Sequence, residues 1–190
     1  MEDNFYQDVI INPENVKDII FLKSEFERCE FQSLNLLSLD LSMVIFQECI
    51  FINCDLSMAI LNKTSFRKIT FDDCKILGVR FDDCNPFLFS VSFKKCILDM
   101  SVFNALSLKK IFFSHCQLRE TDFSDADMQD AVFDHCNLDL AIFENTNLSG
   151  ADFITSFGYI IDPEINYVVK AKFSWPAAEG LLKKYRVFFE

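Results

Sequence analysis

Residues 111–153 read IFFSHCQLRETDFSDADMQDAVFDHCNLDLAIFENTNLSGADF, and within this stretch every fifth residue from Phe113 is large and apolar. We call this the core position. The same spacing extends back to Phe21, apart from a two-residue slip near Pro86, after which it resumes at Leu88. The core position therefore recurs 27 times, as Phe in 15 cases and as Leu in 10.

Neither an α-helix nor a flat strand explains a five-residue spacing. On a helix, steps of five residues spread the apolar side chains over all sides, and on a strand they alternate between the two faces. A chain that turns a corner every five residues keeps all of them inside. The pattern therefore predicts an all-β solenoid, and the alternation of Phe with Leu favours an even number of sides. Four sides give coils of 20 residues with uniform columns such as Phe93, Phe113 and Phe133, in a rod of about seven to eight coils.

Three segments show the repeat as small–polar–Leu/Phe–polar–polar: ADMQD at 126–130, CNLDL at 136–140 and ADF at 151–153. In these segments the chain resembles the pentapeptide repeat proteins, and its expected C-terminal helix, described below, is similar to that of their quinolone-resistance (Qnr-like) branch. The resemblance implies a right-handed quadrilateral parallel β-helix. We expect this β-helix to span residues 21–173, with a two-residue bulge near 86–87 that keeps the coils in register.

Both ends of a stacked solenoid need a cover. Residues 1–20 break the five-residue spacing and are expected to form an N-terminal cap. Residues 174–190 are expected to form a short C-terminal α-helix, with Ser174 as its N-cap, followed by an apolar tail. The tail packs against the last coil or against a second copy of the chain, and the Qnr resemblance favours a homodimer. The expected interface residues are Leu181, Leu182, Tyr185, Val187, Phe188 and Phe189.

Composition narrows the class of protein. The chain is 51% apolar and 25% charged, has no apolar run long enough to cross a bilayer, and starts with a polar, acidic segment unlike a secretory signal. We therefore expect a cytoplasmic protein with reduced cysteines. The net charge of −11 argues against direct binding to nucleic acid, but it is compatible with a protein partner that has a basic groove.

Seven of the eight cysteines fall two positions before a core position, and Cys84 keeps the same spacing before Pro86, where the slip begins. This placement indicates small buried thiols rather than disulfides or metal ligands. His115 and His135 are 20 residues apart and are expected to face solvent, where two imidazoles without a third ligand bind a metal weakly. We therefore expect no metal site and no cofactor. The eight cysteines are Cys29, Cys49, Cys54, Cys74, Cys84, Cys96, Cys116 and Cys136.

No pattern in the sequence indicates an enzyme. The acid pairs at 72–73 and 82–83 lie half a coil apart, on opposite sides of the rod, so they cannot act on one substrate bond. Phosphate-binding loops and nucleophile elbows are absent from the sequence, and a filled rod is expected to leave no pocket of ligand size.

Charge is concentrated in one part of the chain. Residues 21–118 carry 11 acids and 11 bases, whereas residues 119–153 carry nine acids and only Arg119. These acids form either a solvated surface or an anionic girdle that binds a partner. We call them the acidic girdle: Glu120, Asp122, Asp125, Asp127, Asp130, Asp134, Asp139, Glu144 and Asp152.

The girdle and the Qnr resemblance together imply a rod that mimics duplex DNA, binds a type II topoisomerase such as DNA gyrase and protects it from fluoroquinolones. A scaffold or spacer for another protein is the alternative. A third hypothesis is a thiol- or metal-active protein that uses the column of cysteines from Cys54 to Cys136.

Overall fold

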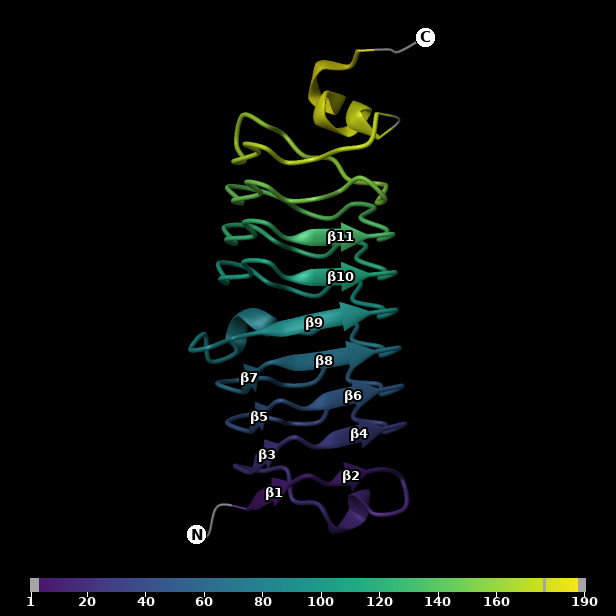
Figure 1. The fold of residues 1–190 in the computed structure, drawn as a ribbon, viewed down its shortest axis with the longest axis vertical. Coiled ribbons are helices and arrows are strands. Elements are labelled where there is room, and N and C mark those ends of the chain that lie inside the picture. The colour runs from purple at the N-terminus through teal and green to yellow at the C-terminus, as the bar shows by residue number, and fades with distance from the viewer. Residues whose placement is uncertain (1–3, 176, 188–190) are drawn as a thin grey trace.

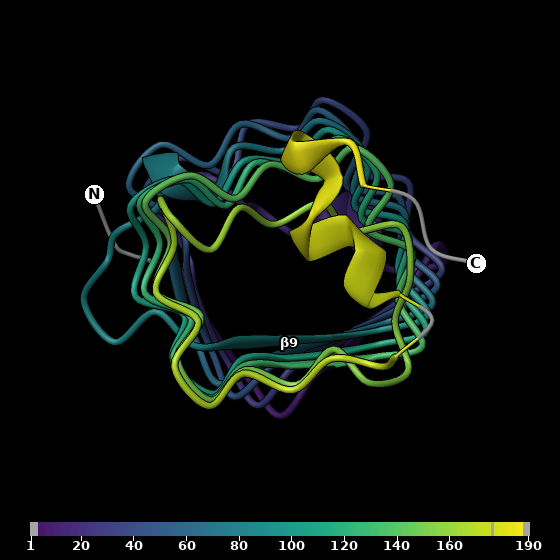
Figure 2. The same cartoon turned by 90° about the horizontal axis from the view of Figure 1, so that it is seen from above.

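The computed structural model describes residues 4–175 and 177–187, over which the chain forms a parallel β-solenoid (Figure 1). One face is a seven-stranded parallel sheet in the order β11-β10-β9-β8-β6-β4-β2, and a second sheet has the order β1-β3-β5-β7. Viewed along the stacking axis, the coils have a roughly four-sided outline (Figure 2). The predicted class of fold is therefore confirmed.

The strands are short because each occupies one side of a coil. The strands are β1 (Phe5–Gln7), β2 (Ile10–Ile11), β3 (Glu25–Glu27), β4 (Glu30–Gln32), β5 (Ile45–Gln47), β6 (Ile50–Ile52), β7 (Ser65–Arg67), β8 (Ile69–Asp72), β9 (Val91–Lys94), β10 (Phe112–Ser114) and β11 (Val132–Asp134). The 3₁₀-helices are η1 (Val16–Asp18), η2 (Phe81–Asp83), η3 (Ala178–Leu181) and η4 (Lys183–Tyr185).

The corners are made by residues with a left-handed backbone. Among the described residues, 26 non-glycine residues have φ between 50° and 62°, and most of them lie two positions after a core position. Such a conformation is unfavourable for L-residues, but here it is combined with hydrogen bonds between coils. The amide of Met43, for example, donates to the carbonyl of Asn62 at 3.0 Å.

The core positions stack in columns inside the rod. Phe93, Phe113 and Phe133 lie above one another, with ring centroids 5.3 and 5.2 Å apart and ring planes within 10° of parallel. Rings of the neighbouring column meet them edge-on, as in the pair Phe113 and Phe123 at 71°. Both geometries are favourable for aromatic pairs and add to the burial of the rings. The predicted columns are confirmed.

The slip near Pro86 produces a loop on one face. Across it the register changes from 20 to 22 residues, so that Phe71 pairs with Phe93. The sequence-based prediction that Leu88 points inward is wrong, because Leu88 has a left-handed backbone and is 62% exposed. Phe89 packs on the core instead, edge-on to the rings of Phe66 and Phe81.

The same loop marks a change in the interior. Below it, the second phenylalanine column runs through Phe26, Phe46 and Phe66. Above it, that side carries Leu108, Met128 and Leu148, and the second column continues on another side of the coil from Phe81 to Phe103. Each cross-section thus keeps two phenylalanine columns, although one of them changes sides.

The N-terminal residues are already part of the stack. The strands β1 and β2 lie within the expected cap at 1–20, yet β1 pairs with β3 and β2 pairs with β4 in the common 20-residue register. The coil therefore begins before Phe21, because Tyr6 stacks on Phe26 and Ile11 is fully buried in place of core-position aromatics.

The C-terminal segment lies across the end of the last coil (Figure 2). The predicted α-helix is replaced by η3 and η4, and Ser174 precedes them without capping either. Gly180 packs so closely against Tyr159 that an added Cβ would lie 2.2 Å from the Tyr159 carbonyl oxygen. This contact holds the segment against the coil, and its backbone bonds run to the third residue back, as from Gly180 to Ala177.

In the part of the chain that the structure describes, no helix combines the length and the apolar character that a membrane span requires.

The cysteines line narrow slots of the core, as predicted. All eight are buried with free thiols. The Cys49 thiol donates to the carbonyl oxygens of Phe26 and Gln47, each at 3.3 Å. Burial raises the pKa of Cys49 to about 12 and also raises the pKa of Cys84. All eight thiols are buried in the core, which argues against the thiol-active hypothesis.

The first prediction concerns the phenylalanine columns. Replacing Phe113 with Ala removes a fully buried ring from between two stacked rings and should lower the free energy of unfolding by about 3–5 kcal/mol. Its neighbour Phe112 is 44% exposed on the same strand, so Phe112→Ala is the matched control and should cost less than about 1 kcal/mol. Chemical denaturation measures both, and equal effects would contradict the columns.

The second prediction concerns the thiols. With a pKa of about 12, Cys49 at pH 8 is thiolate in only about one molecule in 10⁴. We expect Ellman's reagent to label the native protein very slowly and to label all eight cysteines once guanidinium has unfolded it. Rapid labelling of any thiol in the native protein would contradict this account.

Candidate functional site

The acidic girdle surrounds the rod rather than lining one side. Glu120, Asp125 and Asp130 occupy three successive corners, each with φ between 55° and 58°. Asp122 and Asp127 lie on the two sides between these corners, in bridges with neighbouring coils. Because the chain turns at each corner, the carboxylates point away from the rod in different directions.

The remaining girdle acids complete the circuit. Asp134 ends β11, and Asp152 is bridged to Val132 on the same face. Asp139 and Glu144 each follow a core position on the next two sides of the coil. The sequence-predicted residues are thus brought together as a ring over neighbouring coils, and not as a single cluster.

The girdle acids differ in exposure and in whether their carboxylates accept hydrogen bonds that support the fold. Half-buried Asp122 accepts a hydrogen bond from the Ser124 amide at 2.8 Å, and Asp152 accepts one from the Ile154 amide at 3.1 Å. These are Asx turns, which support the corner that follows. By contrast, five girdle residues are exposed, and they are the ones most free to meet a partner: Glu120, Asp125, Asp130, Asp139 and Glu144.

Few cations neutralise the girdle. Asp127 pairs with Lys109 at 3.1 Å and Asp152 with Lys172 at 3.1 Å. Apart from these pairs and the contacts of Asp134 with histidine, the girdle makes no ion pair among residues 4–175 and 177–187. Among the residues that the structure describes, seven of the nine girdle acids have no lysine or arginine partner, so the girdle retains most of its negative charge.

Asp134 has the most partners of the nine acids. The Oδ1 atom lies 2.6 Å from His135 Nδ1, and Ser114 Oγ donates to Oδ2 at 3.0 Å. These hydrogen bonds lower the pKa of Asp134, His135 contributing most. His115 and His135 are exposed with stacked rings, whereas the adjacent Cys116 and Cys136 point inward, as predicted.

Asp134 is a partner of both histidines that the sequence pattern did not predict. Its place could have been found from the 20-residue register, because Asp134 lies one coil above Ser114 and next to His135. The two imidazoles are therefore not isolated, because a carboxylate lies beside both of them.

Basic side chains gather on the face that carries the loop. Arg67 and Lys68 lie on the coil below it and Lys109 and Lys110 on the coil above. Lys68 pairs with Glu48 at 2.8 Å, and the Arg67 guanidinium lies 5.9 Å from the centre of the Phe87 ring. These four basic side chains make this face of the rod, next to the girdle, less negative than the girdle itself.

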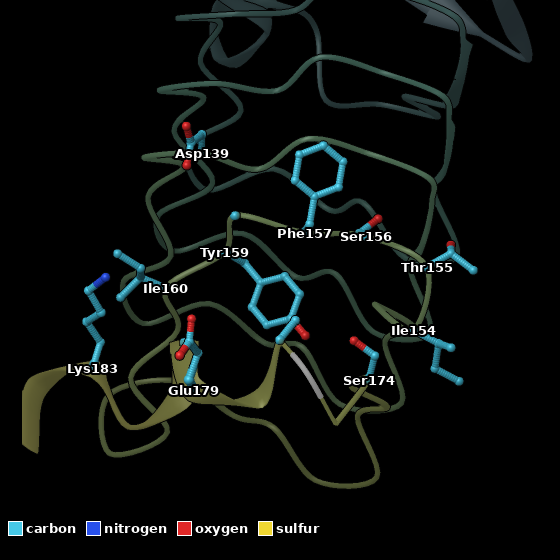
Figure 3. A pocket seen from close by; sticks show the side chains of 13 residues that line it. Asp139, Ile154, Thr155, Ser156, Phe157, Tyr159, Ile160, Ser174, Glu179 and Lys183 are labelled. Carbon is cyan, nitrogen blue, oxygen red and sulfur yellow. The ribbon is translucent and has the colours of Figure 1, made fainter. Parts of the chain in front are cut away.

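The expectation that the rod leaves no pocket is wrong at its C-terminal end. A hollow of about 550 Å³ lies between the last coil and η3, where the capping segment covers only part of the open end (Figure 3). Tyr159, Glu179 and Lys183 are among its lining residues, and burial raises the pKa of the Tyr159 hydroxyl. The girdle residue Asp139 lies at its edge.

Of the expected interface residues at the C-terminus, Leu181 packs against the core. Leu182, Tyr185 and Val187 are exposed, and Lys184 binds Asp162 at 2.8 Å, which ties this segment to the last coil. Phe188 and Phe189 lie outside the described residues.

Comparison with known proteins gives the following. A family model described as "Pentapeptide repeat region" matches residues 19–86, and one described as "Pentapeptide repeats (8 copies)" matches residues 96–134 and 116–153. No curated protein sequence matches the chain.

Several solved structures align with most of the chain at low identity. One is a trypsin-treated form of QnrB1, a plasmid-mediated fluoroquinolone resistance protein, with 19% sequence identity and a TM-score of 0.46. The alignment covers 99% of this chain and 98% of the QnrB1 chain. HetL, a pentapeptide repeat protein involved in heterocyst differentiation regulation from the cyanobacterium Nostoc sp. strain PCC 7120, is 13% identical over 90% and 89% of the two chains, with a TM-score of 0.31.

The family models together span most of the solenoid, on both sides of the loop. Their repeat is the one whose core positions stack inside this rod. Since the matches at 19–86 and 96–153 cover more than half of the 190 residues, this chain belongs to the pentapeptide repeat family.

Proposed function

We propose that this protein is a non-enzymatic mimic of duplex DNA that binds the DNA groove of a type II topoisomerase, DNA gyrase, in the cytoplasm and protects it from fluoroquinolones. The observation that carries the proposal is the acidic girdle, which presents carboxylates in several directions around a rigid rod. The choice of gyrase follows the resemblance of the chain to the quinolone-resistance branch of the family.

The charge density of the girdle supports the proposal. Residues 119–153 fill less than two coils, which at a rise of about 4.8 Å per coil is roughly 8 Å of the axis. Nine carboxylates over that length give about one negative charge per 1 Å, against about one per 1.7 Å in duplex DNA. A basic groove shaped for DNA thus meets a comparable field at the girdle.

The density over the whole rod is much lower. The net charge of −11 is spread over roughly 40 Å of stacked coils, which is about one charge per 4 Å. The contact with the groove is therefore centred on the girdle, and the charge-balanced residues 21–118 lie outside it.

The third prediction tests the girdle in a DNA-supercoiling assay with purified gyrase. We expect low-micromolar protein to inhibit supercoiling or to restore it in the presence of a fluoroquinolone. The variant with Asp122, Asp125, Asp127 and Asp130 all changed to Asn should lose at least tenfold in potency, because the charge is removed while Asn keeps the turn hydrogen bonds and tolerates a left-handed backbone.

The matched control removes the same number of charges from the other end of the rod. It changes Glu14, Glu25 and Glu30 to Gln and Asp18 to Asn, and it should retain full potency. Equal loss in both variants would show that only net charge matters. If the unaltered protein has no effect on gyrase at any concentration, the function proposed here is wrong.

We further propose that two copies associate through the C-terminal segment into a homodimer. Leu182, Tyr185 and Val187 are exposed on the segment that crosses the end of the rod. Apolar side chains grouped at one end of a rod favour a two-fold contact. The dimer places two girdles near its centre, which lengthens the anionic surface available to a groove.

The fourth prediction concerns this dimer. Light scattering should give twice the chain mass for the unaltered protein and the single chain mass for the double variant Leu182→Glu and Val187→Glu, because charged side chains cannot be buried there without partners. The control Ile60→Glu changes a similarly exposed residue on the side of the rod and should remain dimeric. An unaltered protein of monomeric mass would refute the dimer.

A scaffold or spacer that binds another protein is the second candidate function. It is favoured by the charge balance of residues 21–118 and by exposed apolar side chains such as Ile10 and Ile50 on the outer side of the seven-stranded sheet.

A further inference from the structure

Three potential metal ligands from two neighbouring coils meet on the outside of the rod. His115, Asp134 and His135 each offer one ligand atom, and these atoms all lie within 4.8 Å of one another. The two imidazole rings are stacked with centroids 4.9 Å apart and planes 12° from parallel. Imidazole and carboxylate are a donor set that suits a first-row transition ion better than calcium or magnesium.

The solenoid fixes the backbone of all three residues. His115 and His135 occupy equivalent corners one coil apart, with φ of 56° and 52°. The His115 amide donates to the Asp134 carbonyl oxygen at 2.7 Å, and the His135 amide donates to Thr155 Oγ1 at 2.9 Å. Only side-chain rotation is therefore needed to close the three groups around an ion.

The carboxylate of Asp134 is oriented by its own partners. Ser114 Oγ donates to Oδ2 at 3.0 Å and Thr155 Oγ1 donates to Oδ1 at 3.2 Å. Hydrogen-bonded carboxylates of this kind are typical of metal sites, where outer residues hold the ligand in place. Asp134 thereby lies within reach of both rings, with Oδ1 2.6 Å from His135 Nδ1 and Oδ2 3.9 Å from His115 Nδ1.

We propose that His115, Asp134 and His135 bind one Zn²⁺ ion on the surface of the rod, with water as the fourth ligand. Ligand atoms around tetrahedral zinc lie about 3.4 Å apart, so the present spacings, none above 4.8 Å, need to change by at most about 1.4 Å. The ion replaces the hydrogen bonds that His135 Nδ1 makes with Asp134 and His115 Nδ1 makes with Ser114. Each neutral imidazole that binds the ion through Nδ1 carries its single N–H proton on Nε2, so no net proton is lost.

The buried thiols take no part in this site. Cys116 and Cys136 follow the two histidines directly, but they are fully buried on the inner side of the coil. The proposed ligands are thus nitrogen and oxygen only, which gives the site a spectroscopic signature distinct from that of a cysteine site. A bound ion would also link two adjacent coils and so stabilise the folded rod.

The fifth prediction uses tag-free full-length protein and three single variants: His115→Asn, Asp134→Asn and His135→Asn. Asparagine tolerates the left-handed backbone of the two corners, so the variants should keep the native circular dichroism. Titration calorimetry with Zn²⁺ should give one site per unaltered chain and at least tenfold weaker affinity in each variant. Excess Zn²⁺ should raise the melting temperature of the unaltered protein only.

The control is Asp73→Asn, which removes a carboxylate from the equivalent corner two coils below and should bind Zn²⁺ as the unaltered protein does. Co²⁺ substitution should give weak visible bands without strong near-ultraviolet thiolate absorption. The proposal is overturned if the unaltered protein does not bind Zn²⁺ at millimolar concentration, if thiolate absorption appears, or if any of the three variants binds as tightly as the control.

Discussion

The structure depends on burying one large apolar side chain for every five residues of chain. Because a coil has only four sides, each core ring contacts the rings directly above and below it and the edges of rings on adjacent sides. This packing coexists with a left-handed corner after almost every core position, a conformation that L-residues otherwise avoid. The rod is stable as a whole because burial and inter-coil hydrogen bonds recur at each step, whereas the cost of a corner is local.

A filled interior leaves function to the outer surface. Outward positions take no part in the core, so their side chains can vary without disturbing the stack, and the same backbone presents carboxylates, imidazoles or lysines at equivalent corners. Glu120, Asp125, Asp130, His115 and Lys110 all adopt nearly the same φ. The rod is therefore a regular support on which charged side chains are placed at fixed intervals. In the girdle, nearly all of these charges are negative.

The repeat made the fold, the columns and the inward cysteines predictable, since one spacing governs them all. Three features were not predictable for physical reasons. Phe89 packs on the core in place of the predicted Leu88, because a loop of irregular backbone has no fixed spacing. The prediction of a C-terminal α-helix was wrong because Gly180 is held against Tyr159, in a contact that sequence patterns do not reveal. Asp134 was overlooked because its role depends on a neighbour 20 residues away, Ser114, as much as on His135 beside it.

The transfer of one phenylalanine column from one side to another divides the rod into two modules. Within each module, successive coils are interchangeable in shape, so a duplicated or deleted 20-residue coil keeps every ring over its neighbour. At the seam between Phe66, Phe81 and Phe89 no such exchange is possible, because the aromatic side differs above and below it. The two family-model matches stop and restart around this seam, at residues 86 and 96. Whole coils can accordingly be added or removed on either side of the seam without disturbing the ring columns, but not across it.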